Sequence, residues 1–242
     1  MKIDGAIFDL DGTLLDSMFI WDTIGEEYLR SRGIEPHENL NEIFKSMSLY
    51  QAARYYQTEY GLTDSADAIM SGVNGMIRHY YTAEVLPKTG VTEFLAELKN
   101  RRVKMCIATA TDRHLAEAAL SRTGLLSYFG EIFTCGSVGH GKDRPDIFHA
   151  AHRSLQTPKN STWVFEDALY AVRTAKSAGY HVVGVFDRSE PNIDEIRGLA
   201  DLYIRSFEEM EGILNEEGFN DSRLRFQRRS RDSGRHQDHH GA

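Results

Sequence analysis

Two patterns of hydrophobic residues divide the chain. Residues 3–8 (IDGAIF) form a short apolar run, which predicts a strand that ends at Asp9. From about residue 18 to residue 85 the apolar positions recur at helical spacing, as at Ile20 and Ile24, and glycines end or weaken the segments. We predict no strand in this stretch, and helices within 20–33, 49–61 and 65–85.

After Pro87 the pattern changes to alternating helices and strands. The predicted helices cover 91–101, 112–124, 145–155 and 168–179, and the predicted strands cover 103–108, 131–135, 162–165 and 181–186. Such alternation is typical of βαβ units around a buried parallel sheet, which the first strand must rejoin. We therefore predict an α/β fold: a Rossmann-like core formed by 1–17 and 86–215, with an all-helical unit inserted at 18–85.

Composition and charge narrow the class of protein. Of the 242 residues 41% are hydrophobic and 26% are charged, and no apolar run approaches the roughly 20 residues of a membrane-spanning helix. Residues 221–242 hold six Arg and three Asp, so this tail carries +3 and the rest of the chain −11. The segment 216–242 is expected to be a disordered basic tail, and the acidic body argues against nucleic-acid binding. Two cysteines and an N-terminus without a signal-like apolar stretch favour the cytoplasm.

Polar side chains follow several of the predicted strands, at or just beyond the strand ends. In parallel sheets the carboxyl ends of the strands meet at one edge, where ligands bind. We therefore expect one shared site. Its candidate residues are Asp9, Asp11, Thr109, Lys142, Glu166 and Asp167.

This set of residues predicts phosphate chemistry. Clustered carboxylates repel one another unless a cation lies among them. Mg²⁺ fits such a cluster, because this hard cation binds a few carboxylates together with the substrate phosphate. Thr109 and Lys142 are hydrogen-bond donors suited to phosphate oxygens. A carboxylate nucleophile, a metal and a cation together indicate phosphoryl transfer through an aspartyl phosphate. Taken singly, each Asp or Thr is explained as well by a helix N-cap.

Four segments resemble the sequence motifs of the haloacid dehalogenase-like (HAD) hydrolases. They occur in the family's order, and the resemblance extends over about residues 1–215. The pattern is similar to the group of β-phosphoglucomutases and phosphoglycolate phosphatases with a helical cap. The four segments are DLDGTLLDS at 9–17, CIATAT at 106–111, GKDRPDIF at 141–148 and VFEDALYAVRTAKSAG at 164–179.

The resemblance implies a role for each motif residue. Asp9 is expected to be the nucleophile and Asp11 the general acid and base. Glu166 is expected to bind the metal either directly or through a neighbouring group. The implied phosphate-binding residues are Gly12, Thr109, Ala110 and Lys142, and the implied Mg²⁺ ligands are Asp9, Asp11 and Asp167.

The helical insertion corresponds to the family's cap, which excludes water and selects the substrate. Trp21 and Lys45 are the candidate substrate residues in this cap. Related sugar mutases carry a His where this chain has Trp21, and an Arg in the cap loop where Lys45 is the only cation. We therefore expect a phosphatase acting on a small phosphorylated metabolite, without nucleic-acid, membrane or obligate protein partners. The alternatives are a sugar-phosphate mutase and a non-catalytic binding or regulatory protein on the same scaffold.

Overall fold

The sheet that carries the site has six parallel strands. The computed structural model describes residues 1–44 and 49–215, so Lys45 and the tail 216–242 lie outside the described residues. Each pair of neighbouring strands is parallel. The strands, in their order across the sheet, are β5 (Ile132–Thr134), β4 (Lys104–Thr109), β1 (Gly5–Phe8), β6 (Thr162–Glu166), β7 (His181–Val185) and β8 (Leu202–Ile204).

Helices cover both faces of this sheet because its strands are apolar on both sides. In β1, Phe8 faces one buried cluster and Ile7 faces the other, as the two-residue period of a strand requires. The first face packs against α5 (Val91–Asn100), α6 (Arg113–Arg122) and α11 (Glu209–Asn215). The second face packs against α8 (Asp146–Leu155), α9 (Leu169–Ser177) and α10 (Ile193–Leu199).

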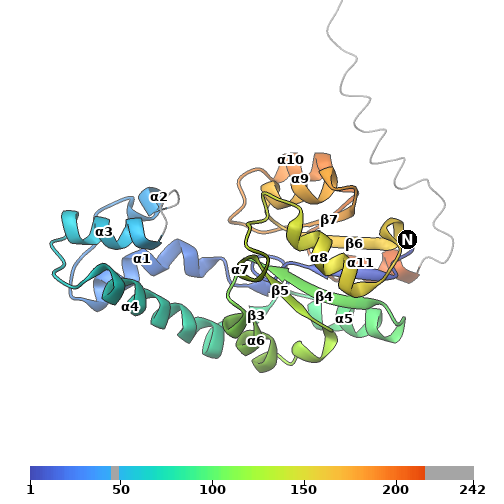
Figure 1. Ribbon diagram of the computed structural model, residues 1–242, viewed down its shortest axis with the longest axis horizontal. Helices are drawn as coiled ribbons and strands as arrows, with labels where there is room; N and C mark the ends of the chain where they lie inside the picture. The colour runs from blue at the N-terminus through green and yellow to red at the C-terminus, as the bar shows by residue number, and fades with distance from the viewer. Residues whose placement is uncertain (45–48, 216–242) are drawn as a thin grey trace, which may run out of the picture.

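A helical arm lies between β1 and β4 in the chain and extends to one side of the sheet (Figure 1). It comprises α1 (Phe19–Ser31), α2 (Leu40–Phe44), α3 (Leu49–Glu59), α4 (Ala66–His79) and a π-helix, η1 (Tyr80–Glu84). The chain enters the arm through β2 (Leu15–Asp16) and leaves it through β3 (Leu86–Pro87), and these two segments pair antiparallel. The two connections to the arm therefore form one narrow hinge.

The structure confirms the predicted α/β fold with a parallel sheet and an inserted helical region. The prediction missed α2, α10, α11 and β8, each of which has at most seven residues. The strand predicted over 131–135 is one residue too long, because β5 ends at Thr134. There Thr134 and Ser137 form a capping box that starts the short helix α7 (Cys135–Val138). Within the described ranges, every helix is too short or too polar to span a bilayer.

Candidate active site

Asp9, Lys142 and Glu166 form a buried ion-pair cluster at the carboxyl edge of the sheet. The Lys142 ammonium donates to Asp9 Oδ1 and, at 2.5 Å, to Glu166 Oε1. Asp9 directly follows β1, Glu166 is the last residue of β6, and Lys142 lies in the loop after α7. All three are buried. The parallel sheet thus brings together residues that are up to 157 positions apart in the sequence.

Glu166 and Asp167 are held in place by local hydrogen bonds. Glu166 Oε2 accepts from the backbone N–H groups of Asp167 (3.1 Å) and Ala168 (3.3 Å). Thr13 Oγ1 donates to Asp167 Oδ1 at 2.8 Å. The other oxygen of Asp167 comes so close to Gly12 that a Cβ there would lie 2.2 Å from it, so only glycine fits at this position, where φ is +76°.

The electrostatics of this cluster require a further positive charge. Burial raises the pKa of Asp9 to about 6, although Lys142 opposes this shift. Burial and the neighbouring charges of Asp9 and Glu166 raise the pKa of Asp167 well above its usual range. One carboxylate oxygen from each of Asp9, Glu166 and Asp167 lies within 4.8 Å of the others. Three closely spaced, buried carboxylates, with raised pKa values at Asp9 and Asp167, fit a metal ion.

Asp11 has different surroundings, made of neutral hydroxyl groups. Its Oδ1 accepts from Ser17 at 2.6 Å and from Tyr81 at 2.5 Å, and its Oδ2 accepts from Thr111 at 2.5 Å. Burial and the charge of Asp9 raise the pKa of Asp11, and the three hydroxyl groups oppose that shift. A raised pKa means that the carboxyl group holds a proton more readily than a free one, which suits a proton donor.

Thr109 and Ala110 lie at the end of β4, on the same edge. The Thr109 hydroxyl accepts from the backbone N–H of Thr111 at 3.0 Å, which leaves its own proton free to donate. Ala110 is exposed. Trp21 lies in the first turn of α1 with 48% of its surface exposed, and among the described residues its side chain has no hydrogen bond or ring contact with the predicted site residues.

Sequence reasoning missed three residues that contact Asp11. Ser17 and Thr111 both lie inside motif segments, but the motifs predict no role for either of them. Tyr81 was one of many aromatic residues in a helical unit, which indicates packing. These residues could be recognised only by listing the polar groups that surround Asp11. Such a list requires the three-dimensional fold.

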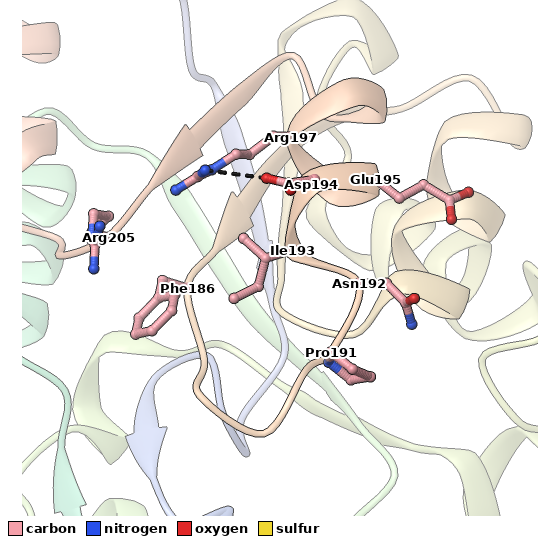
Figure 2. A pocket seen from close by; sticks show the side chains of 8 residues that line it. All are labelled: Phe186, Pro191, Asn192, Ile193, Asp194, Glu195, Arg197 and Arg205. Carbon is pink, nitrogen blue, oxygen red and sulfur yellow. Dashed lines mark hydrogen bonds and ion pairs between the residues drawn. The ribbon is translucent and has the colours of Figure 1, made fainter.

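A separate cavity of about 560 Å³ lies beyond the ends of β7 and β8 (Figure 2). Arg197 pairs with Asp194 at 3.3 Å on its rim, and Arg205 lies over the ring of Phe186. The clustered carboxylates Asp9, Glu166 and Asp167 are not among its lining residues, so this cavity is separate from the candidate active site. Its lining residues are Phe186, Pro191, Asn192, Ile193, Asp194, Glu195, Arg197 and Arg205.

Comparison with known proteins identifies the class. The family model of the haloacid dehalogenase-like hydrolases matches residues 6–185, and the chain belongs to this family. A phosphorylated carbohydrates phosphatase of Thermotoga maritima is 26% identical over 177 residues, covering 73% of this chain and 82% of that protein. The (DL)-glycerol-3-phosphatase 2 of Arabidopsis thaliana is 30% identical over 202 residues, covering 80% and 82% of the two chains.

Solved structures agree on the fold. A Thermotoga maritima protein assigned provisionally as a beta-phosphoglucomutase superposes with a TM-score of 0.79 at 24% identity, covering 89% of this chain and 100% of that one. Proteins named beta-phosphoglucomutase and phosphoglycolate phosphatase are both among the matches, which agrees with the group suggested by the motifs. The relatives support assignment of the chain as a phosphoric monoester hydrolase.

Proposed function

We propose that the protein is a Mg²⁺-dependent phosphatase that hydrolyses a small phosphorylated sugar or polyol through an aspartyl phosphate. The observation that carries this proposal is the pairing of buried Asp9 with Lys142, beside a second carboxyl group, Asp11, that is bonded only to hydroxyl groups in the described contacts. The first arrangement suits a nucleophile and the second suits a proton carrier. The names of the phosphorylated carbohydrates phosphatase and the glycerol-3-phosphatase support the substrate class.

In the first step, Asp9 attacks the phosphorus atom and the bond to the leaving alcohol breaks. Lys142 holds Asp9 Oδ1, so we assign the attack to Oδ2. Asp11 gives its proton to the departing oxygen. Lys142 and the Thr109 hydroxyl offset the charge on the phosphoryl oxygens. At Gly12 and Ala110 the backbone comes close to these oxygens.

In the second step, a water molecule attacks the phosphorus atom of the aspartyl phosphate. Asp11, now ionised, accepts a proton from this water. The bond between Asp9 and phosphorus breaks, which releases inorganic phosphate and restores the Asp9 carboxylate. Both half-reactions therefore use one proton site in opposite directions.

Asp9, Asp167 and the main-chain carbonyl of Asp11 would hold Mg²⁺. The ion would supply positive charge that stabilises the phosphoryl group during transfer. Both oxygens of Glu166 already accept hydrogen bonds, which favours for Glu166 the role of orienting Lys142 and the loop at Asp167.

The test is turnover of p-nitrophenyl phosphate by the full chain, with and without Mg²⁺. We expect activity that needs Mg²⁺ and disappears in Asp9→Asn. Activity that persists after chelation, or in Asp9→Asn, contradicts the mechanism. A panel of sugar and polyol phosphates then identifies the preferred substrate.

A separate assay distinguishes hydrolysis from phosphoryl transfer between sugar positions. The protein is supplied with a hexose 1-phosphate and a catalytic amount of the bisphosphate. We expect free phosphate to appear faster than the hexose 6-phosphate. The reverse order would identify a mutase, and no reaction with any ester would support a non-catalytic role.

A further inference from the structure

We infer that Tyr81 and Thr111 are positioning residues for Asp11, and that Tyr81 links the orientation of this acid and base to the hinge of the helical arm. The inference rests on the proposed phosphatase reaction. Tyr81 is fully buried, and its hydroxyl donates to Asp11 Oδ1 at 2.5 Å. Asp11 precedes the arm in the chain and Tyr81 lies in η1, the last helix of the arm, so this bond joins the two ends of the arm.

Tyr81 lies in the π-helix η1, at the end of the arm. Its wider turn is closed by the bond from Val85 N to Tyr80 O at 3.0 Å, five residues apart. Adjacent side chains of a helix point about 100° apart. Tyr80 and Tyr81 accordingly have different partners: Tyr80 donates to Glu27 in α1, whereas Tyr81 donates to Asp11.

The core fixes this segment in place. Arg122, the last residue of α6, donates to the backbone carbonyl of Tyr81 at 3.4 Å and to that of Val85. The Tyr81 hydroxyl is therefore held relative to the sheet edge rather than carried freely with the outer helices. A side chain anchored in this way can orient its partner.

The three hydroxyl groups leave Asp11 one favoured direction for proton exchange. A carboxylate oxygen has two lone pairs. Ser17 and Tyr81 occupy those of Oδ1, while Thr111 occupies one on Oδ2. The remaining position on Oδ2 is thus where Asp11 passes a proton to the leaving group and receives one from water.

The experiment compares two esters that differ in their need for a proton. Phenolate is the stronger base, so phenyl phosphate depends on Asp11 more than p-nitrophenyl phosphate does. In Tyr81→Phe we expect kcat/KM to fall about tenfold on phenyl phosphate and less than about twofold on p-nitrophenyl phosphate, because part of the general-acid contribution is lost. The matched control is Tyr80→Phe, which removes a hydroxyl group from the same π-helix and should leave the ratio of the two rates unchanged.

Variants of Thr111 test the inference independently. They also test it if Tyr81→Phe does not fold. Thr111→Val should reproduce the selective loss on phenyl phosphate, and Thr111→Ser, which keeps the hydroxyl, should restore the wild-type ratio. Equal losses on both esters, or no loss, would overturn the inference while the proposed function stands. A wild-type protein inactive on both esters would refute the proposed function, and this inference with it.

Discussion

The surroundings of Asp9 and of Asp11 differ, although the two residues are only two positions apart. Asp9 contacts the ammonium of Lys142, whereas Asp11 accepts hydrogen bonds from the hydroxyl groups of Ser17, Tyr81 and Thr111. A cation beside a carboxylate stabilises the charged form and discourages protonation. The three hydroxyl groups donate to Asp11 without carrying a charge, so they stabilise its carboxylate less than an ammonium group would. In the proposed mechanism the contrast separates the nucleophile from the group that exchanges a proton.

The two regions also come from different parts of the fold. Asp9, Lys142 and Glu166 all lie in the core, at the ends of strands or in the loops that follow them. The partners of Asp11 include Ser17, just before the helical arm, and Tyr81, in its last helix η1. In the proposed mechanism the attacking group thus has its partners in the core, and the proton carrier also has a partner in the arm.

The largest expected effect of the variants compared below comes from Lys142→Met, which removes the cation that contacts Asp9. We expect turnover of p-nitrophenyl phosphate to fall by about 10³-fold, since a charge that stabilises the transferred group is lost. Lys159→Met, which changes an exposed lysine bonded to a backbone carbonyl, serves as the control. Activity within a few-fold of wild type in Lys142→Met would show that Asp9 does not depend on this cation.

The next effect comes from Asp11→Asn, which removes the proton carrier and leaves the Asp9 region intact. We expect steady-state turnover of p-nitrophenyl phosphate to fall by about 10²-fold, because water is no longer activated. The aspartyl phosphate should then accumulate and be detected as a mass increase in acid-quenched protein. Asp16→Asn, an exposed neighbour in β2, should behave like wild type. Failure to trap any phosphorylated protein would remove Asp11 from the second step.

The residues around Asp9 were predictable from the sequence because they lie at strand ends or in the loops that follow them. A short apolar run fixes each strand, and the polar residue after it must lie at the carboxyl edge. That argument found Asp9, Thr109, Lys142, Glu166 and Asp167 without knowledge of the sheet order. Their contacts were not predictable, since the pairing of Lys142 with both Asp9 and Glu166 depends on loop conformation.

The Asp11 region could not be predicted in the same way. Helical periodicity indicated one segment over 65–85, but the structure changes from α4 to η1 at Tyr80. Adjacent residues of a helix point about 100° apart, and of these two tyrosines it is Tyr81 that contacts Asp11. Nothing in the pattern of hydrophobic residues distinguishes Tyr80 from Tyr81. Strand β8 was missed for a simpler reason, because three residues are too few to reveal alternation.

A third prediction concerns the ion pair that holds the hinge. Lys88, just after β3, lies 2.7 Å from Asp187 Oδ2 and donates to the Phe186 carbonyl at 2.7 Å. Burial alone would raise the pKa of Asp187, but bonds from Lys88 and Ser189 outweigh it and lower this pKa. We expect Asp187→Asn to reduce the free energy of unfolding by about 1–3 kcal/mol at pH 7, since it breaks a buried charge-assisted bond.

The pH dependence of that effect tests its cause. Because the pKa of Asp187 is lower in the folded protein, its stabilising contribution is present above the unfolded value of about 4 and is lost as the pH falls through the folded value. Urea unfolding of wild type and Asp187→Asn at several pH values measures the difference. The difference should shrink towards acid, and a constant difference would assign the effect to packing instead. Asp194→Asn, in a largely exposed pair, is the control.

The smallest effect is expected at Trp21, on the arm. Its side chain is 48% exposed at the start of α1, close in sequence to the catalytic loop, so it can contact the substrate without holding the fold together. For the best substrate of the panel, we expect Trp21→Ala to raise KM about threefold with kcat unchanged, because a partly exposed aromatic contact contributes about 0.5–1.5 kcal/mol. Tyr50→Ala changes a comparably exposed aromatic residue in α3 and should leave KM unchanged. A fall in kcat in Trp21→Ala would extend the influence of the arm from substrate binding to the chemistry at Asp11.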